Sequence, residues 1–166
     1  MSTIASISPT TRDSFFRATV IGGLILGMLH LIIQSWFVFS ILEKSPFISV
    51  LQYVASGAMG NAAFAGGPAT ALLGLVFDVI MTTIMAGVFI LSAHRIPLLR
   101  RHVIPGALLY GFGVFVVMNF IVLPLSAAPP LPAPPMWLFI ENILVHILLI
   151  GLPLGILVQR NANTNP

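Results

Sequence analysis

The sequence predicts an all-α polytopic membrane protein, in which four transmembrane helices form an antiparallel bundle and a short interfacial helix occupies the first outer loop. Three observations predict this fold: the composition, the length of the apolar stretches and the distribution of basic residues. Hydrophobic residues make up 58% of the 166 residues and charged residues only 7%, against roughly 25% charged in soluble domains. So few charges cannot cover the surface of a soluble domain. We therefore expect a single membrane domain over residues 1–166, with lipid as the solvent of its exterior.

Four apolar stretches are long enough to cross a bilayer as helices. They cover residues 18–42, 68–93, 103–125 and 136–158. Each exceeds the roughly 20 helical residues that span about 30 Å of hydrocarbon. A helix also pairs its own backbone groups, which lipid requires. The first stretch is too long for a cleaved signal peptide, so we expect it to remain as a helix.

The basic residues predict the orientation of the four spans. Cytoplasmic loops carry an excess of Lys and Arg, so both termini and the middle loop are expected on the cytoplasmic side. The seven basic residues form no basic surface interleaved with aromatic residues, which excludes nucleic acid as a partner. Six of them lie on one side of a four-span arrangement and one on the other: Arg12, Arg17, Arg95, Arg100, Arg101 and Arg160 against Lys44.

The two outer loops have different characters. Ser45 followed by Pro46 is a helix-start signal, and apolar residues then recur at helical spacing, so we predict an interfacial helix over residues 46–56. A re-entrant segment is the alternative. Residues 126–135, SAAPPLPAPP, predict a stiff polyproline-like strap across the outer mouth of the bundle. The segments 1–11 and 161–166 are predicted to be disordered tails.

Small residues at helical spacing predict close helix packing. In lipid, helices associate where small side chains let their backbones approach. These pairs are interpreted as contacts within one chain, with dimerisation as the alternative, and Pro153 is expected to kink the fourth span. The positions are Gly23 and Gly27 in the first span and Gly151 and Gly155 in the fourth.

Seven polar residues lie inside the predicted spans, where polar groups are costly and mark function by default. With a rise of about 1.5 Å per residue, all seven lie between the bilayer centre and about 9 Å outward. They predict a polar pocket in the outer half of the membrane, sealed below by apolar side chains. The residues are His30, Gln34, Asp78, Asn119, Glu141, Asn142 and His146.

Helical geometry and charge indicate which of these side chains pair. His30 and Gln34 share a helix face at i and i+4, as do Asn142 and His146. Glu141 points about 100° away from its neighbour in sequence, toward another helix or the outer loop.

The carboxylates need partners at this depth, where no Lys or Arg lies, so the two histidines are expected to supply them. Such a pair either transfers protons or forms a neutral buried hydrogen bond. The amides Gln34, Asn119 and Asn142 have a simpler alternative role as hydrogen bonds between helices.

Several function classes follow from this layer. No hydrolase motif, phosphate loop or nucleophile–base signature is present, so we expect no catalytic residues. Cys is absent, which excludes disulfides and Cys-based metal sites. The first hypothesis is a non-enzymatic accessory or small-ligand-binding protein without metal or cofactor, acting alone, as a homo-oligomer or in a larger membrane complex. The second is proton or small-solute transport.

Two cofactor hypotheses remain open beside these. His30 and His146 lie at matching depth on different spans, as axial ligands of haem b would. The same histidines with Asp78 and Glu141 have the ligand types of a zinc site. No tight ligand spacing such as HExxH supports the zinc alternative.

Short motifs in half of the chain resemble a known family. Leu123-Pro-Leu, the proline-rich strap and Glu141-Asn142 followed by His146 resemble the third and fourth helices of the YagU-like inner-membrane proteins. Phe64-Ala-Gly before the second span is also similar. The resemblance implies a bacterial inner membrane, a four-helix fold and no established chemistry. That group is named in connection with acid resistance, which would suit a layer of carboxylates and histidines.

Overall fold

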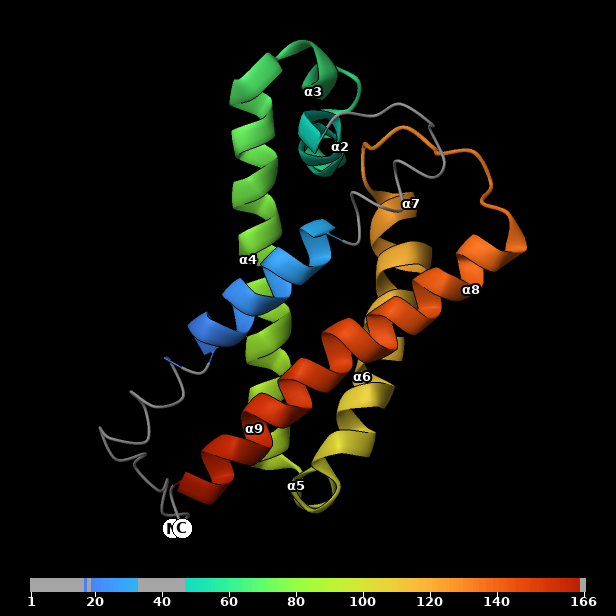
Figure 1. Ribbon diagram of the computed structural model, residues 1–166. Coiled ribbons are helices and arrows are strands. Elements are labelled where there is room, and N and C mark those ends of the chain that lie inside the picture. The colour runs from blue at the N-terminus through green and yellow to red at the C-terminus, as the bar shows by residue number, and fades with distance from the viewer. Residues whose placement is uncertain (1–16, 18, 33–46, 165–166) are drawn as a thin grey trace, which may run out of the picture.

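The computed structural model describes residues 17, 19–32 and 47–164 and is all-α over these residues, with no strand among them (Figure 1). A helix over Thr19–Ile32 comes first. The elements that follow are α2 (Phe47–Met59), α3 (Ala62–Ala65), α4 (Gly67–Arg95), α5 (Pro97–Arg101), α6 (Val103–Val117), the π-helical η1 (Met118–Val122), α7 (Leu123–Leu125), α8 (Met136–Val145), the π-helical η2 (His146–Gly151) and α9 (Leu152–Thr164).

Three of the described helices are long and apolar enough to cross a membrane. They are Gly67–Arg95, the continuous helix Val103–Leu125 and the continuous helix Met136–Arg160, against predicted spans of 68–93, 103–125 and 136–158. The first predicted span, 18–42, is described as a helix only over Thr19–Ile32, because residues 33–46 lie outside the described part.

The chain ends and the first outer loop show two differences from the sequence-based boundaries. Helix α9 continues to Thr164, although a disordered tail was predicted from residue 161; the predicted tail 1–11 lies outside the described residues. Helix α2 runs three residues past the predicted end at 56. It ends where Gly60 adopts a positive φ of 59° and donates its N–H to the carbonyl of Ser56 at 2.8 Å.

The helices cross one another at different inclinations (Figure 1). Helix α6 packs along η2 and α9, and the Thr19–Ile32 helix crosses α4 near the middle of the molecule. Helix α2 is seen end-on in this view and lies across one end of α4. The contact of α2 with α4 depends on Gly74, because a Cβ there would meet the backbone of Leu51 and, at 3.2 Å, that of Ala55.

The helices pack through one apolar core near the crossing. Its aromatic centre is Phe89, whose ring centroid lies 5.1 Å from that of Tyr110. The hydroxyl of Tyr110 donates to the carbonyl of Met85 at 2.7 Å, so its polar end is satisfied within the core region. The buried members of this core are Leu26, Ala86, Phe89, Ala107, Val114, Ile150 and Leu154.

The structure places all four packing glycines at contacts between helices of the same chain. Gly23 and Gly27 face Thr83 and Thr82 of α4. Gly151 and Gly155 face the first turns of α6, where a Cβ at Gly151 would lie 3.1 Å from the Cα of Leu108. Close backbone approach, rather than large interlocking side chains, thus joins these helices.

Each π-helical segment precedes a proline. Pro124 follows η1, and Pro153 follows η2. A proline ring clashes with the carbonyl four residues earlier and lacks the N–H that would bond to it. A wider π turn moves that carbonyl out of the way. At Pro153, where the sequence predicted a kink, the structure therefore shows a π segment in the preceding turn.

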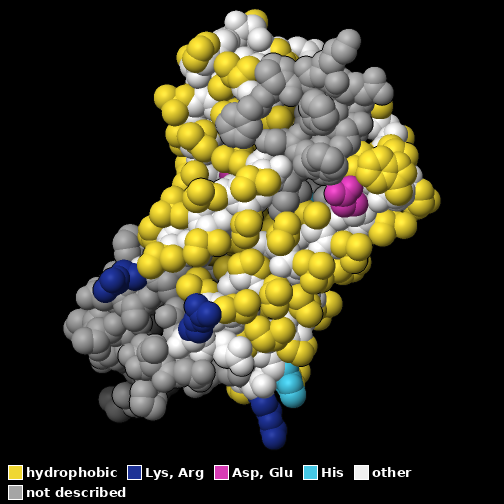
Figure 2. All heavy atoms as spheres, in the orientation of Figure 1, with side chains coloured by type: hydrophobic (Ala, Val, Ile, Leu, Met, Phe, Trp, Pro, Cys, Tyr) yellow, Lys and Arg dark blue, Asp and Glu magenta, His cyan; other side chains and the backbone are white. Residues whose placement is uncertain are grey.

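The outer surface is largely apolar in this view (Figure 2). Large hydrophobic side chains are exposed along the long helices, among them Leu109 at 71% and Met136 at 72%. A soluble monomer rarely exposes contiguous apolar surface beyond a few hundred Å². The apolar exterior supports the membrane-protein interpretation.

Two glycines of α6 provide a test of the packing. Alanine at Gly111 would place its Cβ 3.0 Å from the Cα of Ile147 and 3.1 Å from the backbone nitrogen of Gly151, whereas alanine at Gly113 would meet nothing within 4 Å. We expect Gly111→Ala to lower the free energy of unfolding by about 1–3 kcal/mol. Gly113→Ala should leave it unchanged or raise it by up to about 1 kcal/mol. Unfolding in detergent followed by circular dichroism measures both; equal effects would contradict the packing of α6 on η2.

Candidate functional site

A cavity of about 370 Å³ lies between the helices. Its walls come from the Thr19–Ile32 helix, α2, α4, α6, η1, α7, α8, η2 and the strap of residues 126–135. Most lining side chains are apolar, with a few polar groups among them, which is the composition of small-molecule sites.

The structure brings five of the seven polar residues from the sequence analysis to this cavity. Of the other two, Glu141 is partly exposed and lies outside the set of lining side chains. Adjacent helix positions point about 100° apart, so Asn142 faces the cavity while Glu141 does not. Gln34 lies outside the described residues. The five that line the cavity are His30, Asp78, Asn119, Asn142 and His146.

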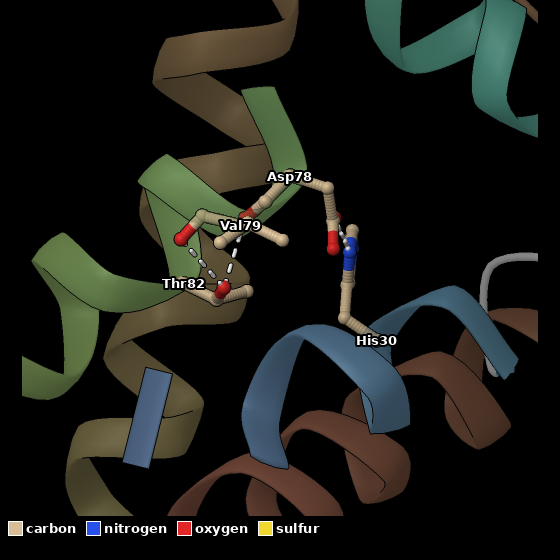
Figure 3. A network of polar contacts seen from close by, with 4 residues as sticks. All are labelled: His30, Asp78, Val79 and Thr82. Carbon is tan, nitrogen blue, oxygen red and sulfur yellow. Dashed lines mark hydrogen bonds and ion pairs between the residues drawn. The ribbon is translucent and has the colours of Figure 1, made fainter. Parts of the chain in front are cut away.

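The centre of the site is a contact between His30 and Asp78 (Figure 3). The Nδ1 atom of His30 donates to Oδ1 of Asp78 and joins the first helix to α4. Asp78 is 2% exposed, whereas 21% of the His30 side chain is exposed. Both side chains belong to the cavity wall. Thr82 supports the turn that carries the carboxylate, because its hydroxyl donates to the backbone carbonyl of Asp78 at 2.8 Å.

The second carboxylate oxygen of Asp78 has no partner within the described part of the chain. Oδ2 is buried and makes no hydrogen bond. Gly27 leaves the space beside it: a Cβ at Gly27 would lie 3.5 Å from Oδ2 and 3.1 Å from the hydroxyl oxygen of Thr82. Leaving such an oxygen unpaired costs free energy, and this oxygen lies beneath the cavity wall rather than on its surface.

The polar residues opposite Asp78 are held by their own helix backbones. The Nδ1 atom of His146 donates to the carbonyl of Asn142 at 2.8 Å. The side-chain amide of Asn119 donates to the carbonyl of Phe115 at 2.9 Å. These bonds fix the orientation of the side chains without joining one helix to another.

Tyr53 on α2 lines the same cavity, although it is not among the seven polar residues that the sequence analysis selects. It is 7% exposed, and its hydroxyl has no hydrogen-bond partner among the described residues. Burial raises the pKa of its phenol above the ordinary value of 10.0, so the group is protonated at neutral pH.

The neighbouring residue Gln52 donates to the carbonyl of Gly67 at 3.1 Å and fixes α2 to α4. The sequence does hold a signal that α2 packs against other helices: Gln52 and Ser56 are polar residues four positions apart in a largely apolar helix.

The cavity is closed toward α5 and bordered by the strap beside α2. Leu26, Val114 and Ile150 belong both to the cavity wall and to the apolar core. At the opposite side, the backbone N–H of Ala127 donates to the carbonyl of Gly57 at 2.9 Å. Ser126, Ala128 and Leu131 of the strap line the cavity.

The described residues include no group of three or more His, Asp or Glu side chains arranged to hold a metal ion. Glu141, one of the four ligands of the zinc alternative, lies outside the lining set. Both histidines of the haem alternative line the cavity, and that alternative stays a prediction.

Comparison with known proteins gives no match: no model of a known protein family, no curated protein and no solved structure matches this chain. The resemblance to YagU-like proteins therefore stays a prediction, and the cavity itself is the basis for a functional proposal.

The His30–Asp78 contact predicts unequal effects of removing either partner. His30→Leu leaves a buried carboxylate with both oxygens unpaired and should lower the free energy of unfolding by about 3–5 kcal/mol. Asp78→Leu leaves a partly exposed imidazole, which water can reach, and should cost about 1–2 kcal/mol. The double variant should be more stable than His30→Leu alone. Urea unfolding of all four forms in detergent measures the coupling; additive effects would show that the two side chains do not interact.

Proposed function

We propose that this chain is a four-span bacterial inner-membrane protein that binds a small amphipathic molecule in the cavity beside Asp78. The mixed lining of the cavity carries this proposal, because His30, Asp78, Asn119, Asn142 and His146 share its wall with apolar side chains. Polar side chains in an apolar cavity are stabilised when a ligand supplies hydrogen-bond partners. The size and largely apolar lining of the cavity fit the range of 300–1,000 Å³ that is usual for small-molecule pockets.

The four-span topology rests on the three long helices and the position of the basic residues. The basic side chains visible in Figure 2 lie in its lower half, toward the end that carries α5. By the positive-inside rule this end faces the cytoplasm. With the predicted span 18–42 as the fourth crossing, the cavity would lie in the outer half of the membrane. Arg95 ends α4, Arg101 ends α5 and Arg160 lies in α9.

The hydrogen bonds favour a binding site over a purely structural polar layer. Polar residues that only join helices would bond across helix interfaces. Asn119 and His146 bond instead to carbonyls of their own helices, and both residues line the cavity. Three methionines, Met81, Met85 and Met118, add flexible apolar surface to the wall, which suits a ligand with an apolar body.

Transport of protons is the second candidate, because a carboxylate and an imidazole in contact are groups that exchange protons. The structure offers less support for a pathway. Toward α5 the cavity ends on core side chains such as Leu26, Val114 and Ile150. Proton movement past them would require the helices to separate.

Native mass spectrometry tests the binding proposal. We expect protein that is extracted from its own membrane in mild detergent to carry a small-molecule adduct at about one per chain. Val54→Phe, which adds volume to a lining residue of α2, should remove the adduct. Met59→Phe changes an exposed position of α2 outside the lining set and serves as the matched control. No adduct on the wild-type chain, or equal adducts on both variants, would contradict binding in this cavity.

Liposomes separate binding from transport. We expect vesicles that contain the protein to dissipate an imposed pH gradient no faster than empty vesicles, because the core closes the cavity toward α5. Internal pH is followed with an entrapped fluorescent dye. A faster flux that Asp78→Asn abolishes would favour proton transport instead.

A further inference from the structure

Two asparagines line the cavity from different helices, Asn119 in η1 and Asn142 in α8. The side-chain amide of Asn142 makes no hydrogen bond among the described residues. In that part of the chain, the buried side-chain atoms without a partner belong to Thr19, Tyr53 and Asp78. The free amide atoms of both asparagines are therefore accessible to a small molecule, whereas Oδ2 of Asp78 is not.

The two amides lie beside the same aromatic ring. The side chain of Asn119 donates to the carbonyl of Phe115, one turn earlier, at 2.9 Å. The ring of Phe115 contacts those of Phe139 and His146, with centroid distances of 5.7 and 5.5 Å. Asn142 shares a helix face with these two residues, because it follows the first by three positions and precedes the second by four. Both asparagines thus lie next to Phe115.

The cavity wall offers no free charged partner to a ligand. The lining residues include no Lys or Arg, and Asp78 is their only carboxylate. One oxygen of Asp78 contacts His30 and the other lies beneath the wall. This holds wherever the protons of that pair reside. The imidazole of His146 already uses Nδ1 on a backbone carbonyl. A charged group that enters an apolar cavity without a partner loses its hydration at a large cost.

We infer that the cavity binds an uncharged alcohol with an apolar body, whose hydroxyl group bridges Asn119 and Asn142. This inference rests on the proposed binding function and names its ligand class. A hydroxyl donates one hydrogen bond and accepts two, and an amide has an acceptor oxygen and two N–H donors. Asn119 keeps its oxygen and one N–H beside the bond to Phe115. The apolar body lies against Met81 and Met118.

The cavity also reaches the apolar exterior. Ile80 of α4 and Leu123 of α7 line it and are 50% and 39% exposed. At the outer end, the strap is bonded to α2 through the N–H of Ala127 and the carbonyl of Gly57. In the proposed four-span arrangement the exposed apolar surface faces lipid, so an alcohol dissolved in the bilayer has access to the cavity from the side.

A hydroxyl group could come from a free alcohol or from the headgroup of phosphatidylglycerol. The lipid also carries an anionic phosphate, which needs cationic or donor partners beside the hydroxyl site. Neither Lys nor Arg lines the cavity. The cavity therefore fits the free alcohol.

Three probes of similar shape and different charge test this inference. Binding of cyclohexylmethanol, cyclohexylmethylammonium and cyclohexanecarboxylate to the full chain in phosphatidylcholine nanodiscs is measured by titration calorimetry, with empty nanodiscs subtracted. We expect the alcohol to bind at least about tenfold more tightly than either charged probe, from the cost of an unpartnered charge. Equal binding of all three, or tighter binding of a charged probe, would overturn the ligand class while leaving a binding cavity. Absence of alcohol binding would also overturn the ligand class, whereas the native adduct tests the binding function by itself.

Substitutions at neighbouring positions locate the hydroxyl site. Asn142→Leu keeps a similar side-chain volume and should weaken binding of cyclohexylmethanol about tenfold, because hydrogen bonds to the amide are lost. Glu141→Gln changes the adjacent residue, outside the lining set, and should leave the affinity unchanged. An unchanged affinity in folded Asn142→Leu protein would overturn the assignment to the asparagine pair. Should that variant fail to fold, Asn119→Leu tests the other half of the pair with the same expected loss.

Adding phosphatidylglycerol to the nanodiscs separates the two hydroxyl sources. An unchanged affinity for cyclohexylmethanol supports a free-alcohol site. A tenfold weaker affinity would show that the lipid headgroup occupies the site and would overturn the free-alcohol assignment.

Discussion

The enclosure of Asp78 is the constraint on which the rest of the site depends. A carboxylate that is 2% exposed in an apolar surrounding needs counter-charge or hydrogen bonds. His30 satisfies one oxygen and in doing so brings the first helix across α4. Gly27 keeps space beside the other oxygen, and Thr82 supports the turn below. Packing of the first helix and geometry of the cavity are therefore set by the same few residues.

Helix existence and the polar layer could be predicted from the sequence because both depend on local patterns. The length of an apolar stretch predicts a membrane-spanning helix without knowledge of the helices around it. The rise per residue along each helix places His30, Asp78 and His146 at similar depths. The pairing of His30 with Asp78 was one of several combinations that this depth allowed. Selecting it required the crossing of the first helix over α4, which a local pattern does not contain.

Two features of the site depend on tertiary contacts that the sequence alone does not fix. Tyr53 reaches the cavity because Gly74 lets α2 approach the backbone of α4. Glu141 lies outside the lining set because helix rotation, rather than depth, decides which side chain faces inward. Depth is readable from a linear sequence, whereas rotation about the helix axis is fixed only by the partners on every side.

The two π turns have a consequence for how one helix serves two surfaces. Each contains one polar residue of the cavity wall, Asn119 in η1 and His146 in η2, and each is followed by a proline. A π turn fits an extra residue into the coil and so changes the angular phase of everything beyond it. Gly111, before η1, packs closely on the backbone of η2, whereas Asn119 and His146 line the cavity. The same two helices therefore present a close-packed surface and a polar cavity wall within a short length.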